Sequence, residues 1–479
     1  MILRVINHPY EFDMKNLCIT FFPHEKIRLE GEEDPVVVTT RRETDGSFFV
    51  SAKVYDVYRE TTAKPEPADE EHLVLSVTLY RLLSGILGFA PPWGVLYGVR
   101  PAKLMHRLCA QMGDDAAVAH FQTAFLTQKS KAELAHEVML HENRSIARSG
   151  PKSFSLYVSI PFCPTRCAYC SFVSHSIEKT HKLMTPYVDL LLRELEETSK
   201  YAKELGLELA TVYFGGGTPT TLSAQDLGRI FSTIEQNFDL SHLMEYTVEA
   251  GRPDTVTRER LEVIHAAGVQ RISINPQSFN DKVLEAIGRR HTAQQTLEAF
   301  ALARDCGFDH INMDFIAGLP EDDLPSFQRS IQTALDLQAE SITVHTLALK
   351  TSAYMVTREQ TFDLKDRLTV SNMVDYAGQT LHGAGYYPYY MYRQSKSLGN
   401  LENVGWCKPG YDCLYNVYMM DETHTVLAVG AGAVTKLRGQ NSGMIERIYN
   451  YKYPYEYIRD FDTLLERKKR IPGFYAEYD

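Results

Sequence analysis

From Ser153 onward the sequence alternates between short apolar runs and amphipathic helical segments. The apolar runs have strand-like composition and are Ser155–Ile160, Leu209–Phe214, Glu245–Ala250, Arg271–Asn275, His310–Ile316 and Ser341–Leu347. Six strand–helix units predict a parallel sheet, because parallel neighbours need a crossover connection that usually contains a helix. Six is fewer than the eight units of a complete TIM barrel. The sequence therefore predicts an α/β fold of the partial (β/α)6 type over residues 151–385, open on one side.

Segments of a different character flank this predicted core. Residues 1–150 begin with strand-like runs at Asn16–Phe22, Pro35–Thr40 and Phe48–Tyr55. Helical patterns follow at Glu71–Gly88, Arg100–Met112 and Ala117–Glu142. Strands first and helices later are typical of an α+β domain, and no motif in it indicates a chemistry. After about residue 385 the pattern loosens, so residues 386–479 are predicted to form an extension that closes the barrel.

Composition narrows the class of protein. Of 479 residues, 44% are hydrophobic and 23% are charged, which is ordinary for a soluble globular protein. The net charge of −11 argues against wholesale nucleic-acid binding. The longest uninterrupted apolar segment, Leu73–Gly88, is shorter than the roughly 20 residues of a spanning helix, and no signal peptide is recognised. We expect a cytoplasmic protein without a membrane span, in a compartment where thiols stay reduced.

Three cysteines follow the first predicted strand of the core. Cys163, Cys167 and Cys170 have the spacing C-x3-C-x2-C. Three thiolates are one too few for a [4Fe–4S] cluster, which usually takes four cysteines, so one iron would stay open to another ligand. The other cysteines are scattered singly and are interpreted as buried small apolar residues: Cys18, Cys109, Cys306, Cys407 and Cys413.

Two other cysteine chemistries compete with the cluster. A structural zinc site normally needs a fourth Cys or His, and only His175 and His181 are near in sequence. A disulfide framework is typical of small domains in oxidising compartments, and this chain is long. The spacing therefore favours an iron–sulfur cluster.

Further polar or glycine-rich motifs follow successive predicted strands. Gly215-Gly216-Gly217-Thr218-Pro219 ends the second strand, and its glycines would let a ligand approach free backbone amides. A phosphate loop is disfavoured because its Lys-Ser/Thr is missing. Glu249, Gln277 and Asp314 come at or after the ends of the third, fourth and fifth strands, and Arg289 and Arg290 could bind carboxylates. Ligands gather at the carboxyl ends of parallel strands, so these residues are predicted to form one site.

The motifs together resemble a known family. With an aromatic residue directly before Cys170, the cysteine spacing resembles that of radical S-adenosylmethionine (SAM) enzymes, and the glycine run resembles their SAM-amine-binding motif. Within that group, several strings resemble oxygen-independent coproporphyrinogen III oxidase and its relatives: Tyr157–Cys170, Gly215–Thr220, Arg271–Thr292, Asp314–Pro320 and Val344–Lys350. The long amino-terminal unit and the strings Tyr389–Gln394 and Glu402–Gly405 resemble the HemZ branch.

The resemblance implies a radical SAM barrel with defined ligands. It places Cys163, Cys167 and Cys170 on a [4Fe–4S] cluster, and Tyr157, Gly216 and Glu249 at a SAM bound to that cluster. A second SAM would contact Tyr169, Gly217, Thr218, Gln277, Arg289, Asp314 and Ala348.

The resemblance also implies a reaction and partners. The expected reaction is the oxidative decarboxylation of coproporphyrinogen III to protoporphyrinogen IX in haem biosynthesis, with electrons from a donor such as flavodoxin or ferredoxin. The substrate carries four carboxylates, so local cations are expected to bind it: Arg289, Arg290, Lys350, Arg393 and Lys396. No catalytic residue is assigned.

The sequence departs from the family pattern at three places. Asn275-Pro276 replaces the usual Gly-Val before Gln277, and Phe172 stands where the namesake enzyme has a fourth cysteine. The haem-chaperone branch has a His-Asn-x-x-Tyr-Trp string, whose nearest match here is Tyr415–Met420, without the His and the Trp. This disfavours the main alternative, a haem-binding chaperone. A radical SAM enzyme acting on another tetrapyrrole is a second alternative.

Overall fold

The computed structural model describes the chain except for residues 24, 99, 171–174, 349–363 and 395–396. Within the described part, the strand order of the main sheet is β13-β14-β12-β11-β10-β9-β8-β5-β15-β16-β17. Its six central strands are parallel neighbours: β5 (Ser153–Ile160), β8 (Glu208–Gly216), β9 (Glu245–Gly251), β10 (Arg271–Ile274), β11 (His310–Ala317) and β12 (Ser341–Thr346). These are the six predicted strands, so the α/β prediction with a parallel core is confirmed.

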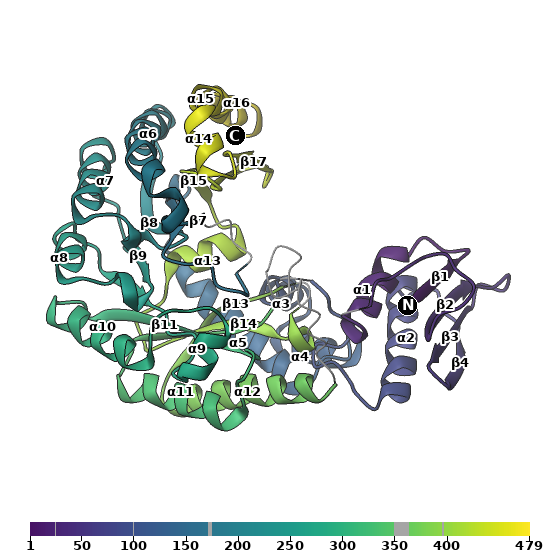
Figure 1. The fold of residues 1–479 in the computed structure, drawn as a ribbon. Helices are drawn as coiled ribbons and strands as arrows, with labels where there is room; N and C mark the ends of the chain where they lie inside the picture. The colour runs from purple at the N-terminus through teal and green to yellow at the C-terminus, as the bar shows by residue number, and fades with distance from the viewer. Residues whose placement is uncertain (24, 99, 171–174, 349–363, 395–396) are drawn as a thin grey trace.

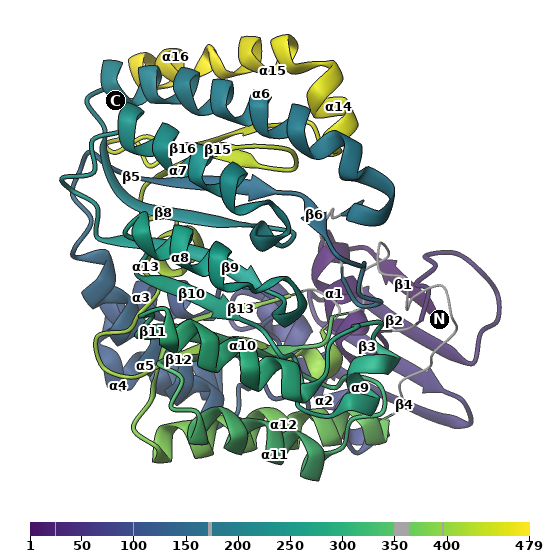
Figure 2. The same cartoon turned by 60° about the vertical axis from the view of Figure 1, so that its left-hand side comes forward.

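Helices lie along the outer side of the curved sheet (Figures 1 and 2). They are α6 (Ile177–Glu204), α7 (Ala224–Asn237), α8 (Arg258–Ala266), α9 (Asp281–Ala286), α10 (Ala293–Asp305), α11 (Leu324–Asp336) and α12 (Leu364–Gly383). Local sequence fixes several starts, because a capping side chain binds an otherwise unpaired amide. The Asp226 amide donates to Ser223 Oγ at 3.0 Å before α7, and Thr292 forms a capping box with Gln295 before α10.

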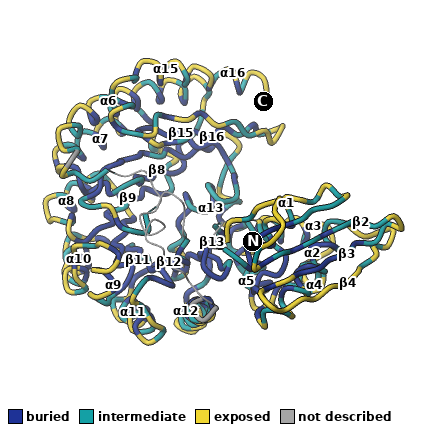
Figure 3. Tube along the Cα trace, turned by 45° about the vertical axis from the view of Figure 1, so that its right-hand side comes forward, coloured by how far each residue is buried: buried dark blue, intermediate teal, exposed yellow. Residues whose placement is uncertain are grey.

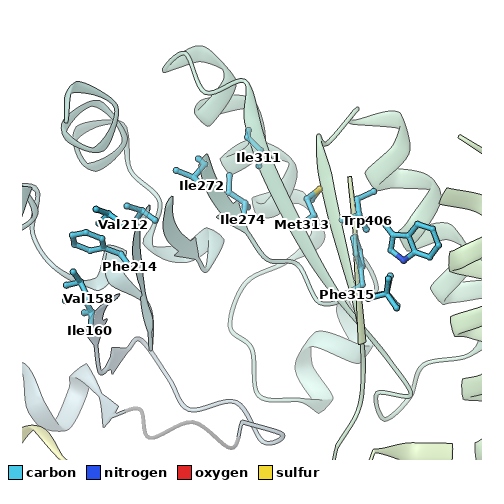
Figure 4. Close-up of a cluster of buried hydrophobic side chains, with 14 of the residues drawn as sticks. Val158, Ile160, Val212, Phe214, Ile272, Ile274, Ile311, Met313, Phe315 and Trp406 are labelled. Atoms are coloured by element: carbon cyan, nitrogen blue, oxygen red, sulfur yellow. The ribbon is translucent and has the colours of Figure 1, made fainter. Parts of the chain in front are cut away.

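The core lies between the sheet and these helices. Strand residues that point outward meet the helices, as Figure 4 shows for Val158, Phe214, Ile272 and Met313. Figure 3 shows the resulting pattern, with buried strands inside and exposed outer helix faces. This packing leaves the strand ends free to carry polar side chains.

The carboxy-terminal residues add strands on both sides of the six parallel strands. β13 (Tyr387–Arg393) and β14 (Glu402–Cys407) add antiparallel strands beside β12. β15 (Thr425–Val429) joins the opposite side, parallel to β5, and β16 (Val434–Arg438) and β17 (Ile445–Tyr449) follow. The remaining helices of this region are α13 (Leu414–Asp421), α14 (Pro454–Arg459), α15 (Phe461–Lys468) and α16 (Arg470–Tyr478). The described strands thus form an open sheet, with β13 and β17 at its edges.

The amino-terminal residues form a lobe with its own sheet and core (Figure 1). The sheet order follows the sequence: β1 (Ile2–Ile6), β2 (Val36–Arg42), β3 (Phe48–Val54) and β4 (Val57–Ala63). Two helices, α1 (Glu11–Phe21) and α2 (Glu71–Leu87), complete the lobe. The predicted strand at Asn16–Phe22 is therefore wrong. Its buried residues Leu17, Cys18 and Phe21 have the three- and four-residue spacing of a helix face.

Three further helices connect the lobe to the barrel. The apolar residues of α3 (Pro101–Met112), α4 (Asp114–Thr123) and α5 (Lys129–Ile146) belong to the core of the main sheet. The cores thus separate near residue 95, while the domain boundaries at residues 150 and 385 stay predictions. Among the described helices, none is long and apolar enough to cross a membrane.

Candidate active site

The predicted site residues lie at the carboxyl ends of neighbouring strands, which together form one edge of the sheet. Gly216 pairs with Ile160 in register, Glu249 pairs with Ser273, and Gln277 bridges to Phe315. Because the six strands run in parallel, their carboxyl ends meet at this edge. The structure therefore brings together residues that lie more than 150 positions apart in the sequence.

The cysteine segment leaves β5 and lies over this edge. Cys163 is in the short strand β6 (Phe162–Cys163), which pairs with β7 (His175–Ser176). Cys163 and Cys167 are buried and Cys170 is half-buried, and none of the three is in a disulfide. The Cys170 amide donates to the Cys167 carbonyl at 3.1 Å, and the Ala168 amide donates to the Ile287 carbonyl at 3.0 Å. The loop is thus anchored beside the end of α9.

The donor set fits a cluster better than a single ion. Among the described residues, the three cysteines do not form a group whose ligand atoms all lie within 4.8 Å of one another. A mononuclear zinc site would need such close ligands, because zinc–ligand bonds are about 2.0–2.3 Å long. Three thiols spread more widely on one loop suit a cluster of several irons.

The glycine run packs against the cysteine segment. The Gly217 amide donates to the Ile160 carbonyl at 2.7 Å, and the Thr218 amide donates to the Phe162 carbonyl at 2.8 Å. The expectation that the glycine amides are free for a ligand is therefore wrong at Gly217. A Cβ at Gly217 would lie 2.6 Å from the Phe162 carbonyl oxygen, so only glycine permits this approach. Thr218 Oγ1 also lies 3.5 Å from Cys163 Sγ, as a donor to the sulfur.

Glu249 lies against a group of tyrosines. Tyr213 donates to Glu249 Oε1 at 2.6 Å. The rings of Tyr157, Tyr213 and Tyr415 are stacked, with centroids 4.4 to 6.3 Å apart. Burial raises the pKa of Glu249 to about 7, and the nearby Asp314 adds to this rise, although the Tyr213 hydrogen bond opposes it. The carboxyl group therefore changes its charge close to neutral pH.

Asp314 begins a polar chain across three strands. Asn312 Nδ2 donates to Asp314 Oδ1 at 2.7 Å, and His345 Nε2 lies 3.8 Å from Asp314 Oδ2. The other ring nitrogen of His345 lies 3.2 Å from the Tyr392 hydroxyl. Burial alone would raise the pKa of Asp314, but the contacts with His345 and Asn312 outweigh it and hold the pKa below its ordinary value. Gln277 lies beside this chain, because its backbone N–H donates to the Asp314 backbone carbonyl at 2.9 Å.

The predicted cations have different environments. Arg289 donates to the Asn275 carbonyl at 2.7 Å and to the Tyr169 hydroxyl at 3.1 Å, so it lies beside the cysteine loop. Arg290 pairs with Glu178 at 2.7 Å on the surface. Arg393 is buried and donates to the carbonyls of Leu96 and Asn400, so it is not free to bind a substrate.

The remaining predicted residues follow β12 or lie outside the described part of the chain. Ala348 is half-buried and bridges to Ser397 across a sheet edge. Lys350, Lys396 and Phe172 lie outside the described residues. A depression of about 520 Å³ beside the cysteine loop is lined by Thr165, Arg166, Ser176, Glu178, Glu285, Gly288, Arg289 and Arg290.

Several residues of the site carry no motif and were not predicted. Tyr213 and His345 follow the two-residue alternation of β8 and β12, which is a signal for an inward position. Tyr415 comes from α13 and Tyr392 from β13, and only the tertiary fold brings them here. Arg252 follows β9 and donates to Cys167 Sγ at 3.9 Å.

Comparisons with known proteins agree with this geometry. The radical SAM superfamily profile matches residues 157–334. The chain is 34% identical over 470 residues to the oxygen-independent coproporphyrinogen-III oxidase-like protein HemZ of Bacillus subtilis, over 95% of this chain and 94% of that protein. It is 31% identical over 318 residues to the heme chaperone HemW of the same organism, over 64% of this chain and 79% of that protein.

A solved structure confirms the fold. Coproporphyrinogen III oxidase (HemN) from Escherichia coli superposes with a TM-score of 0.51, at 21% identity, over 68% of this chain and 72% of that chain. The superposition supports the partial barrel that the strand–helix alternation predicts.

Proposed function

The chain belongs to the radical SAM superfamily and, within it, to the oxygen-independent coproporphyrinogen-III oxidase-like proteins that include HemZ. We propose that it catalyses the oxidative decarboxylation of coproporphyrinogen III to protoporphyrinogen IX. The observation that carries the proposal is the match to HemZ over 95% of the chain, which includes the amino-terminal lobe. The matches to heme chaperones cover 56–66% of the chain.

A [4Fe–4S] cluster and SAM are the cofactors of this superfamily, and the residues present fit them. Cys163, Cys167 and Cys170 would hold the cluster, which supplies the electron that generates a hydrogen-abstracting radical from SAM. Tyr157, Gly216 and Glu249 would contact this SAM. Glu249 would accept hydrogen bonds from the ribose hydroxyls, and its pKa of about 7 leaves it only partly ionised at neutral pH.

A second SAM beside the first is part of the proposal. Its contacts would come from residues around the cysteine loop and the Asp314 chain: Tyr169, Gly217, Thr218, Gln277, Arg289, Asp314 and Ala348. The Gly217 and Thr218 amides are already bonded to the cysteine segment, so these two residues would contribute close approach and a side chain rather than free amides.

In the proposed reaction, each of two propionate side chains would lose a β-hydrogen atom to the SAM-derived radical, release CO2, pass one further electron to an electron acceptor, and become a vinyl group. The chain's role is to orient the propionate and to exclude water that would quench the radical. The stacked rings of Tyr157, Tyr213 and Tyr415 form an apolar wall for this purpose. Among the predicted cations that the structure describes, Arg290 is the exposed one, and it would bind a carboxylate of the substrate. A small electron-transfer protein would reduce the cluster.

A haem chaperone is the second candidate, because the HemW relatives share about 30% identity with this chain. Tyr415 stands where the chaperone string has its His, and here its ring is buried and stacked on Tyr213 at 4.4 Å. A tyrosine held in this way is part of the site wall. This position therefore favours the enzyme over the haem carrier.

Anaerobic assay of the reconstituted protein tests the proposal. Incubation with coproporphyrinogen III, SAM and a reductant should yield vinyl products and 5′-deoxyadenosine, both lost when the three cysteines are replaced by alanine. Production of 5′-deoxyadenosine without a vinyl product would show that coproporphyrinogen III is not the substrate and would favour another tetrapyrrole. Stoichiometric haem binding with neither product would establish the chaperone instead.

A further inference from the structure

Arg252 is a buried cation held beside the cysteine loop. It follows β9 through Gly251, whose φ of +62° turns the chain. The Arg252 side chain is 3% exposed and is fixed by Asp254, whose two carboxylate oxygens accept from Nε and Nη2 at 2.9 and 2.8 Å. This bidentate pairing aims the remaining nitrogen, Nη1, at the loop.

Nη1 of Arg252 reaches three atoms of the cysteine loop. It donates to Thr165 Oγ1 at 2.8 Å, to the Thr165 carbonyl at 3.4 Å and to Cys167 Sγ at 3.9 Å. Arg289 lies beside the same loop, where it donates to the Tyr169 hydroxyl at 3.1 Å. Guanidinium groups from two different elements therefore contact the loop, and that of Arg252 reaches Cys167.

A second sulfur of the loop has an uncharged donor. Cys163 Sγ accepts from the Thr218 hydroxyl at 3.5 Å. Near Arg252 and Arg289, burial and these two cations lower the pKa of His291 to about 3, so this histidine is neutral at physiological pH. Arg252, Arg289 and Asp254 are thus charged groups near the loop that His291 does not supplement at physiological pH.

We propose that Arg252 is a positioning residue that raises the reduction potential of the cluster held by Cys163, Cys167 and Cys170. Hydrogen bonds to the sulfurs and nearby charge are among the factors that set cluster potentials. Reduction adds one negative charge to the cluster, and a cation in a buried site stabilises that charge more than it would in water. The inference rests on the cluster of the proposed function but not on its substrate.

Redox titration followed by electron paramagnetic resonance tests this role on reconstituted holoenzyme without substrate. In Arg252→Gln we expect an about tenfold lower ratio of reduced to oxidised cluster at the wild-type midpoint, equivalent to about 59 mV toward more negative potential. Arg252→Lys keeps the charge and should lie between the two. Asp254→Asn removes the countercharge and should shift the potential in the positive direction.

The control is Arg260→Gln. Arg260 is a partly buried arginine on α8 that donates to the carbonyls of Leu222 and Thr255 and does not reach the cysteine loop. It should leave the midpoint unchanged, with iron and sulfide contents measured for every variant. Unchanged potentials in both Arg252→Gln and Asp254→Asn, or shifts of the same sign, would overturn the proposal. If Arg252→Gln fails to hold the cluster, the sign of the Asp254→Asn shift decides.

Discussion

At the scale of single residues, Glu249 combines burial, a tyrosine partner and a second carboxylate nearby. Its raised pKa means that the folded protein holds a proton which the unfolded chain releases at lower pH. Between about pH 4.5 and 7 the folded state therefore binds more protons, and its stability falls as the pH rises through this window.

Glu249→Gln should abolish this part of the pH dependence. The free energy of unfolding of the wild type, relative to that of the variant, should fall on the order of 3 kcal/mol between pH 4.5 and pH 8. Denaturant unfolding of the cofactor-free protein at several pH values measures the difference. Glu235→Gln, at an exposed position of α7, is the control and should show a constant difference. A pH-independent difference for Glu249→Gln would show that its pKa is ordinary.

The motif-bearing residues of the site could be predicted because each follows a strand whose end faces the same edge. Tyr213 could have been predicted too, because the two-residue alternation of side chains along β8 gives it an inward position. Tyr415 and Tyr392 could not have been predicted, because nothing in their local sequence indicates that they contact strands far earlier in the chain. Arg252 comes three residues after Glu249, yet its contact with Cys167 depends on the path of a turn.

At the scale of elements, the glycine run and the cysteine segment form one unit. Gly217 permits two backbone hydrogen bonds that hold the segment over the sheet edge. A methyl group there would lie 2.6 and 2.8 Å from the carbonyl oxygens of Phe162 and Ile160. Both oxygens are backbone atoms, so no side-chain rotation can remove the clash.

Gly217→Ala should therefore destabilise the protein by about 1–3 kcal/mol and weaken cluster retention. Gly228→Ala is the matched control in the middle of α7, where the new methyl group finds Val263 at an ordinary 3.7 Å. That change should stabilise by about 0.5–1 kcal/mol, because alanine is the better helix former. Thermal unfolding and iron content per chain measure both. Equal effects of the two substitutions would contradict the account of the glycine run.

Element prediction succeeded where periodicity was unambiguous. The six core strands have buried runs bounded by helices with recognisable caps, such as Ser223 and Thr292. Asn16–Phe22 failed because a short apolar run fits a strand and a helix face equally well, and tertiary burial decided for the helix. The strands β13 to β17 were not placed because β14 and β15 join the core through β12 and β5, which lie far earlier in the sequence.

At the scale of the whole molecule, buried ion pairs tie the amino-terminal helices to the barrel. Lys131 of α5 contacts Glu402 of β14 at 2.7 Å and Asp375 of α12 at 2.8 Å. Trp93 donates to the other Glu402 oxygen at 2.7 Å. Burial alone would raise the pKa of Glu402, but Lys131 outweighs it and keeps the pKa below its ordinary value.

Lys131→Met should cost about 3–5 kcal/mol, because it leaves a buried carboxylate without its cation. Adding Glu402→Gln should recover part of that loss. Lys129→Met, two residues away on an exposed side of α5, should change stability by less than about 0.5 kcal/mol. Denaturant unfolding compares the three proteins. A loss for Lys131→Met no larger than that of Lys129→Met would show that the connection is not energetically important.

The most direct test of the central claim is Mössbauer spectroscopy of protein reconstituted with 57Fe, recorded with and without SAM. Three cysteine ligands for four irons predict that one iron in four changes its spectrum when SAM binds, and that the cluster is lost when Cys163, Cys167 and Cys170 become alanine. Four irons that ignore SAM, or a cluster that survives the loss of all three cysteines, would contradict the account.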